Sequence, residues 1–192
     1  MKHYYCNPLN VDYLYQFNQQ GMGQQMGPVQ ISREAADPSM IYFKGKYYIF
    51  ASMTLGVWVS EDLAHWENKR LPDNLPFYDY APDVRVIGDY VYFCASKREE
   101  ICNFYRTKNI EEGPYEEIKG SFDFWDPHQF VDDDGRVYFY WGCANMTPIW
   151  GVEMDPETMH PKTERVELIH GNWNEVGYER DRKSTRLNSS HL

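Results

Sequence analysis

The sequence lacks the features that mark membrane-spanning and nucleic-acid-binding proteins. No apolar run approaches the roughly 18 residues that a membrane-spanning helix needs. Basic residues are few, because 19 Lys and Arg stand against 29 Asp and Glu, which gives a formal net charge of −10. Nucleic acid is bound through a basic face, so this charge balance argues against such a partner. We therefore expect neither a nucleic-acid partner nor a membrane partner.

A secretory leader and paired cysteines are also missing. The first ten residues, MKHYYCNPLN, contain no apolar signal core, so we expect a cytoplasmic protein, with secretion left open. No two cysteines form a CxxC pair, which predicts free thiols and no metal site or other cofactor. The four scattered cysteines are Cys6, Cys94, Cys102 and Cys143.

Strand signals are plentiful, whereas no stretch has convincing helical periodicity. Aromatic residues make up 17% of the chain. In the stretch 124–142, the run His128–Val131 is followed by the acidic turn Asp132–Gly135 and by the aromatic run Val137–Trp141. Two such runs around an Asp-Gly turn predict a β-hairpin.

The same pattern occurs two more times along the chain. The hairpin glycines Gly45, Gly88 and Gly135 recur about every 45 residues, which is the period of a four-stranded propeller blade. A residue followed by a proline opens each hairpin: Asp37-Pro38, Ala81-Pro82 and Asp126-Pro127. The spacing predicts an all-β propeller with blades at about 36–67, 81–118 and 125–168.

The last residues differ from the rest of the chain. The run at 181–191, DRKSTRLNSSH, looks like the in-frame translation of a sequencing adapter, so we expect 181–192 to be a non-native tail. The remaining 1–180 would hold three blades and the start of a fourth. Propellers usually need at least four blades to close. We therefore expect a partial catalytic domain.

Carboxylates stand at corresponding places in the repeats. Asp37 and Asp126 each begin the first strand of a blade, and Asp83 is offset by two residues. First strands of a propeller start near the central axis, so these side chains should converge. Converging carboxylates suit hydrolysis of a glycosidic bond, with one as general base and one as general acid. An alternative stays open at this point, in which each Asp-Pro pair simply caps its strand.

Four ordered motifs make the chain resemble glycoside hydrolase family 43 over roughly residues 7–180. The motifs are Ala36-Asp37-Pro38-Ser39, the run VWVSEDLAHW at 57–66, Tyr80-Ala81-Pro82-Asp83, and Trp125-Asp126-Pro127 with the DDDG turn at 132–135. The resemblance implies a five-bladed β-propeller that acts on plant carbohydrate as an inverting α-L-arabinofuranosidase or β-xylosidase.

By position, the resemblance implies that Asp37 is the general base and that Asp126 tunes the pKa of the general acid. It places Asp83 in the pocket wall or in a structural role. The family's acid is a Glu in a later segment, and Glu179 does not match it. For the 192-residue chain we therefore expect no efficient hydrolysis.

Three more residues are candidates for substrate binding: Tyr80, Trp125 and His128. Core packing of the two aromatic side chains and a packed or solvated His128 remain alternatives. Two other functions also stay open. One is a propeller that binds sugar without cleaving it, and the other is a β-fructosidase-type or mannoside-type glycosidase.

Overall fold

The computed structural model describes residue 11 and residues 16–18, 30–32, 35–75, 80–97, 100–142 and 148–171. Every regular element in these ranges is a β-strand. Accordingly, this part of the chain has no helix that could cross a membrane. The tail at 181–192 and Glu179 lie outside the described residues.

The strands form three four-stranded antiparallel sheets and one two-stranded sheet, and in each sheet the strands pair in chain order. The first sheet consists of β3 (Ser39–Phe43), β4 (Lys46–Phe50), β5 (Gly56–Ser60) and β6 (Glu67–Arg70). The second consists of β7 (Tyr80–Ile87), β8 (Tyr90–Ser96), β9 (Phe104–Thr107) and β10 (Glu116–Ile118). The third consists of β11 (His128–Val131), β12 (Val137–Trp141), β13 (Ile149–Met154) and β14 (Val166–Ile169). The small sheet pairs β1 (Gln16–Asn18) with β2 (Gln30–Ser32).

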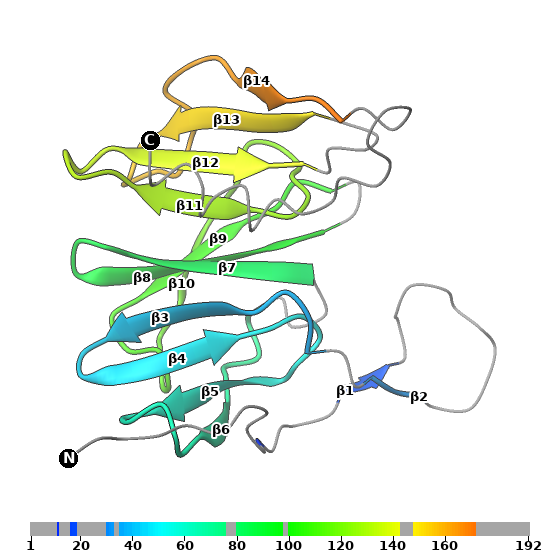
Figure 1. Cartoon of the computed structure of the whole chain (residues 1–192), viewed down its shortest axis with the longest axis vertical. Coiled ribbons are helices and arrows are strands. Elements are labelled where there is room, and N and C mark those ends of the chain that lie inside the picture. Colours follow the sequence, from blue (N-terminus) through cyan, green and yellow to red (C-terminus); the bar gives the residue numbers. More distant parts are fainter. Residues whose placement is uncertain are drawn as a thin grey trace.

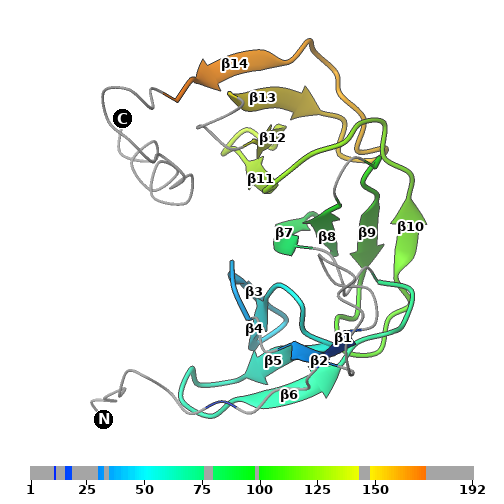
Figure 2. The same ribbon diagram turned by 90° about the vertical axis from the view of Figure 1, so that its right-hand side faces the viewer.

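The three large sheets follow one another along an arc, as the blades of a propeller do (Figures 1 and 2). Their first strands, β3, β7 and β11, lie on the concave side, and their last strands, β6, β10 and β14, lie on the convex side (Figure 2). Neighbouring first strands contact each other, because β7 touches both β3 and β11. The predicted all-β fold and its three repeats are therefore confirmed.

In the three large sheets, one strand was not predicted from the sequence. The first sheet continues through β6, whose residues Glu-Asn-Lys-Arg are all polar. This outermost strand buries no apolar side chain, so it has no apolar alternation that the sequence could show. The backbone pairs it with β5 all the same, from Gly56↔Arg70 to Val59↔Glu67.

Two apolar layers fill the spaces between successive sheets. The layer between the first and second sheets includes Val57, Val91 and Phe93. The layer between the second and third includes Phe124 and Phe139, whose ring centroids are 4.8 Å apart. Burial of one such aromatic side chain contributes roughly 1.5–3 kcal/mol. Cys94 and Cys102 are buried free thiols, as the sequence predicted for them.

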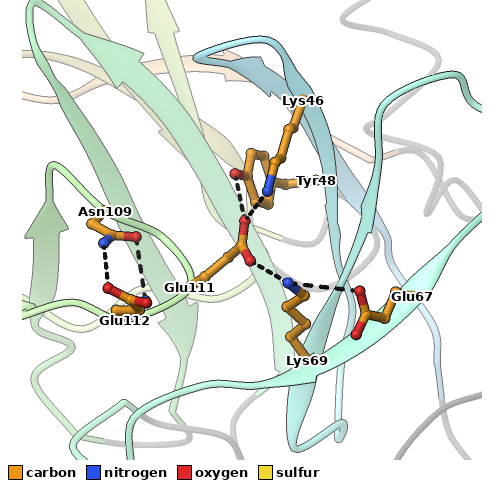
Figure 3. A network of polar contacts seen from close by, with 7 residues as sticks. All are labelled: Lys46, Tyr48, Glu67, Lys69, Asn109, Glu111 and Glu112. Carbon is orange, nitrogen blue, oxygen red and sulfur yellow. Dashed lines mark hydrogen bonds and ion pairs between the residues drawn. The ribbon is translucent and has the colours of Figure 1, made fainter.

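A carboxylate in the β9–β10 connection ties the second sheet to the first (Figure 3). Glu111 accepts hydrogen bonds from Lys46 (2.8 Å) and Tyr48 (3.1 Å) of β4, and from Lys69 (2.6 Å) of β6. Burial by itself would raise the pKa of Glu111, but these donors outweigh burial and lower it to about 2. Burial and the Glu111 charge raise the pKa of Tyr48 to about 12. At neutral pH the network therefore holds an ionised Glu111.

Candidate active site

The residues just before Pro38, Pro82 and Pro127 share an unusual backbone conformation, and we call them the entrance residues. The φ angles are 50° at Asp37, 47° at Ala81 and 59° at Asp126. This left-handed region is uncommon for side chains other than Gly, Asn and Asp, and a following proline normally drives the backbone towards extended geometry. Strain of this kind gathers at functional sites. The three positions are thus equivalent in structure, and two of them carry a carboxylate.

Closing hydrogen bonds support the same equivalence. The N–H of Ser52 donates to the carbonyl of Ala36 at 2.9 Å, and the N–H of Gly142 donates to that of Trp125 at 2.8 Å. Both carbonyls belong to the residue just before an entrance residue. The open ends of the first hairpins in the first and third sheets are therefore closed in the same way. Asp37 and Asp126 thus occupy equivalent positions in the two sheets.

Asp83 lies further inside and joins all three first strands. Asp83 is only 4% exposed. Oδ2 accepts the backbone N–H of Gln129 at 2.6 Å, and Oδ1 accepts the hydroxyl of Ser39 at 3.5 Å. Oδ1 also lies 3.2 Å from His128 Nδ1. These contacts give Asp83 a structural task between β3, β7 and β11, and its part in a sugar site stays a prediction.

His128 is packed rather than free in solvent. Its ring faces Asp83 on one side and stacks on Tyr140, with ring centroids 6.3 Å apart and planes 25° apart. His128 is therefore packed against neighbouring side chains, and its part in a sugar site stays a prediction.

The two predicted aromatic residues lie next to each other across the second and third sheets. The ring centroids of Tyr80 and Trp125 are 6.1 Å apart, with an angle of 37° between the planes. Each directly precedes an entrance residue, and each is partly exposed. Partly exposed rings beside Asp126 could stack on a sugar, as aromatic faces do in binding sites.

Sequence reasoning missed the polar residues that support these strands. Gln129 is fully buried, its Nε2 donates to the carbonyl of Asp83 at 3.3 Å, and its own carbonyl accepts from Arg85 Nε at 2.9 Å. Ser52 and Ser96 are also fully buried. A polar residue at an inward strand position, as at Gln129, is the signal that could have pointed to this network.

The arrangement suits acid–base chemistry. Asp37 and Asp126 are partly exposed on two different sheets, where solvent and a ligand can reach them. Across the described ranges, no three His, Cys, Asp or Glu residues are grouped so that they could hold a metal ion. Pairs of carboxylates are the groups that carry out glycosidic hydrolysis, one as general base and one as general acid.

A family model named Glycosyl hydrolases family 43 matches residues 28–183, which is most of the chain. The chain belongs to glycosyl hydrolase family 43. A curated relative, Xylosidase/arabinosidase 43A of Humicola insolens, is 28% identical over 67% of this chain and 48% of its own length. The chain thus spans about half the length of this curated relative.

Solved structures of family 43 proteins have the same fold as this chain. A bifunctional GH43-CE protein of Bacteroides eggerthii matches with a TM-score of 0.61 and 22% identity, over 75% of this chain and 21% of its own. An exo-1,5-alpha-L-arabinanase from a bovine ruminal metagenomic library matches with a TM-score of 0.57 and 22% identity, over 76% and 58%. A xylan beta-1,4-xylosidase of Bacillus halodurans matches with a TM-score of 0.56 and 20% identity, over 77% and 35%. At these identities the likeness concerns the fold alone.

Proposed function

We propose that the protein is the N-terminal part of an inverting glycosidase that releases arabinofuranosyl or xylosyl units from plant carbohydrate. Asp37 is the general base that activates water, and Asp126 tunes the pKa of the general acid. The observation that carries the proposal is the shared left-handed backbone of Asp37 and Asp126 at equivalent entrances of two sheets. Family membership supplies the reaction class.

The sugar assignment rests on the names of similar proteins. The curated relative is a xylosidase/arabinosidase, and solved structures with the same fold include an arabinanase and a xylosidase. A furanose or pyranose ring could stack on the Tyr80 and Trp125 pair beside Asp126. The complete enzyme closes, in this proposal, as a five-bladed propeller whose later sheets bring the acid.

The general acid lies, in this proposal, outside the described residues. A base and a pKa-tuning carboxylate cannot protonate the leaving oxygen. The 192-residue chain by itself should therefore hydrolyse unactivated arabinosides and xylosides poorly. A chain that continues this sequence over the length of its relatives, here called the complete enzyme, should hydrolyse them well.

The test is hydrolysis of aryl α-L-arabinofuranosides and aryl β-xylosides by the complete enzyme, followed by NMR to establish the anomer first formed. We expect inversion. In Asp37→Asn, kcat/KM should fall about 10³-fold, because a carboxamide cannot take the proton from water. Asn also tolerates left-handed backbone, so the fold should persist with an unchanged Tm. Retention of configuration, or normal turnover by Asp37→Asn, would contradict the proposal.

A further inference from the structure

Two buried serines accept the same hydrogen bond at the entrances that follow them. Ser52 comes shortly after β4, and its Oγ accepts the N–H of Ala81 at 2.8 Å. Ser96 ends β8, and its Oγ accepts the N–H of Asp126 at 2.9 Å. Neither serine has solvent-exposed surface. The first and second sheets therefore each hold the entrance residue of the next sheet through one hydroxyl.

The bond acts where the backbone is strained. Ala81 and Asp126 have φ angles of 47° and 59°, and each precedes a proline. A buried N–H without a partner destabilises the fold, so an acceptor is needed at this point. The serine oxygen satisfies the N–H and fixes the orientation of the peptide plane. The direction in which Cβ leaves the backbone is then fixed as well.

We propose that Ser96 is a positioning residue that aims the Asp126 carboxylate, whereas Ser52, with the same bond, aims nothing. This inference rests on the proposed function, in which Asp126 tunes the general acid. An Asp side chain has only two rotatable bonds, so the backbone largely decides where its carboxylate lies. Ala81 has no carboxylate to aim. The two serines differ in what they hold and are alike in how they hold it.

Accurate placement matters because the influence of one charge on another depends on their separation. Catalytic groups must be held within about 0.5 Å and 10–20° of the productive geometry, and buried hydrogen bonds provide that restraint. Ser96 can supply it because it is part of a β-strand and fully buried. The restraint comes from the second sheet, while the carboxylate belongs to the third.

The third sheet does not repeat the device. Gly142 makes the closing bond that Ser52 makes in the first sheet, but it has no hydroxyl. A Cβ added at Gly142 would lie 2.3 Å from the carbonyl oxygen of Pro148, so no serine fits there. Among the described residues, the hydroxyl device therefore serves the entrances at Ala81 and Asp126.

The experiment compares Ser96→Ala with the matched control Ser52→Ala in the complete enzyme. Each variant removes one hydroxyl acceptor from a fully buried site, so the Tm of the two variants should fall by similar amounts. In Ser96→Ala, kcat should fall about tenfold, as expected for one lost hydrogen bond, with little change in KM. In Ser52→Ala, kcat should stay at the wild-type value, because Ala81 has no carboxylate. Ser96→Thr keeps the acceptor and should restore most of kcat.

Amide hydrogen exchange gives a second measurement, which the 192-residue chain itself allows. Ser96→Ala should speed exchange at the Asp126 N–H, and Ser52→Ala should speed it at the Ala81 N–H. Unchanged exchange at Asp126 in Ser96→Ala would overturn the inference. Equal kcat in the two alanine variants would also overturn it, whatever their Tm.

Two outcomes need separate treatment. If Ser96→Ala does not fold, Ser96→Cys keeps the side-chain size with a poor acceptor, and a wild-type kcat in that variant would overturn the inference. If the wild-type complete enzyme hydrolyses no glycoside at all, the proposed function fails, and the inference fails with it. A difference confined to the serine variants bears on the inference alone.

Discussion

Two carboxylates cross the boundary between the first and second sheets, one near each end of the β3–β4 hairpin. Glu111 contacts Lys46, which pairs with Phe43 next to the hairpin turn. Asp83 contacts Ser39, which pairs with Phe50 at the open end. Asp83 is buried and Glu111 is half-buried, and their partners differ in kind.

The difference separates a stabilising end from a candidate catalytic end. Glu111 is held by two lysines and a tyrosine hydroxyl, which together neutralise its charge (Figure 3). Asp83 is held by a backbone N–H, a serine hydroxyl and a histidine, and none of these is a permanent cation. The turn end therefore holds its carboxylate mainly with two lysine cations, whereas the open end holds Asp83 with polar donors.

The largest effect on stability is expected for Asp83→Ala. The change leaves the N–H of Gln129 without an acceptor at a buried site and removes the partner of His128. A loss of about 3 kcal/mol in the free energy of unfolding should follow. Urea unfolding measures it. A loss below that of Glu111→Gln would contradict the ranking of the two ends.

A smaller loss is expected for Glu111→Gln. The variant keeps the size of the side chain but removes the charge that Lys46 and Lys69 contact. Hydrogen bonds to charged groups are worth more than neutral ones, so about 2 kcal/mol should be lost. Glu111 contacts the turn end of the β3–β4 hairpin, whereas the entrances lie at the open end, so kcat of the complete enzyme should not change. A large fall in kcat would show that the two ends are coupled.

The pH dependence of stability sharpens the same comparison. The pKa of Glu111 is lowered from 4.5 to about 2 in the folded protein. The stabilisation from its ionised form is therefore fully present above about pH 4.5 and is lost as the pH falls through about 2. Between pH 4.5 and pH 2, the free energy of unfolding should fall more steeply with decreasing pH for the wild type than for Glu111→Gln. Parallel curves would contradict this assignment.

The smallest effect is expected for Lys69→Gln. Glu111 keeps its contacts with Lys46 and Tyr48 in this variant, and the Lys69 side chain is one-third exposed. A loss of about 0.5 kcal/mol should follow, within the range for partly exposed ion pairs. Thermal unfolding beside Glu111→Gln measures it. A loss equal to that of Glu111→Gln would mean that one lysine carries the whole network.

The sequence predicted the repeat well because each repeat has a strong local signal. A residue followed by a proline, an apolar run and a glycine turn mark β3, β7 and β11 in turn, and the pairing of Asp37 with Asp126 follows from their shared place in it. The polar strand β6 has no such signal. The contacts of Asp83 with Gln129, and of Ser96 with Asp126, join residues distant in the chain, so no local pattern could predict them.

The shared entrance geometry of Asp37 and Asp126 is the centre of the account. The most direct test is the kcat/KM of the complete enzyme and of Asp37→Asn on an aryl α-L-arabinofuranoside and an aryl β-xyloside, with Tm measured in parallel. The account predicts a loss of about 10³-fold with an unchanged Tm. A variant that folds normally and turns over at the wild-type rate would contradict it.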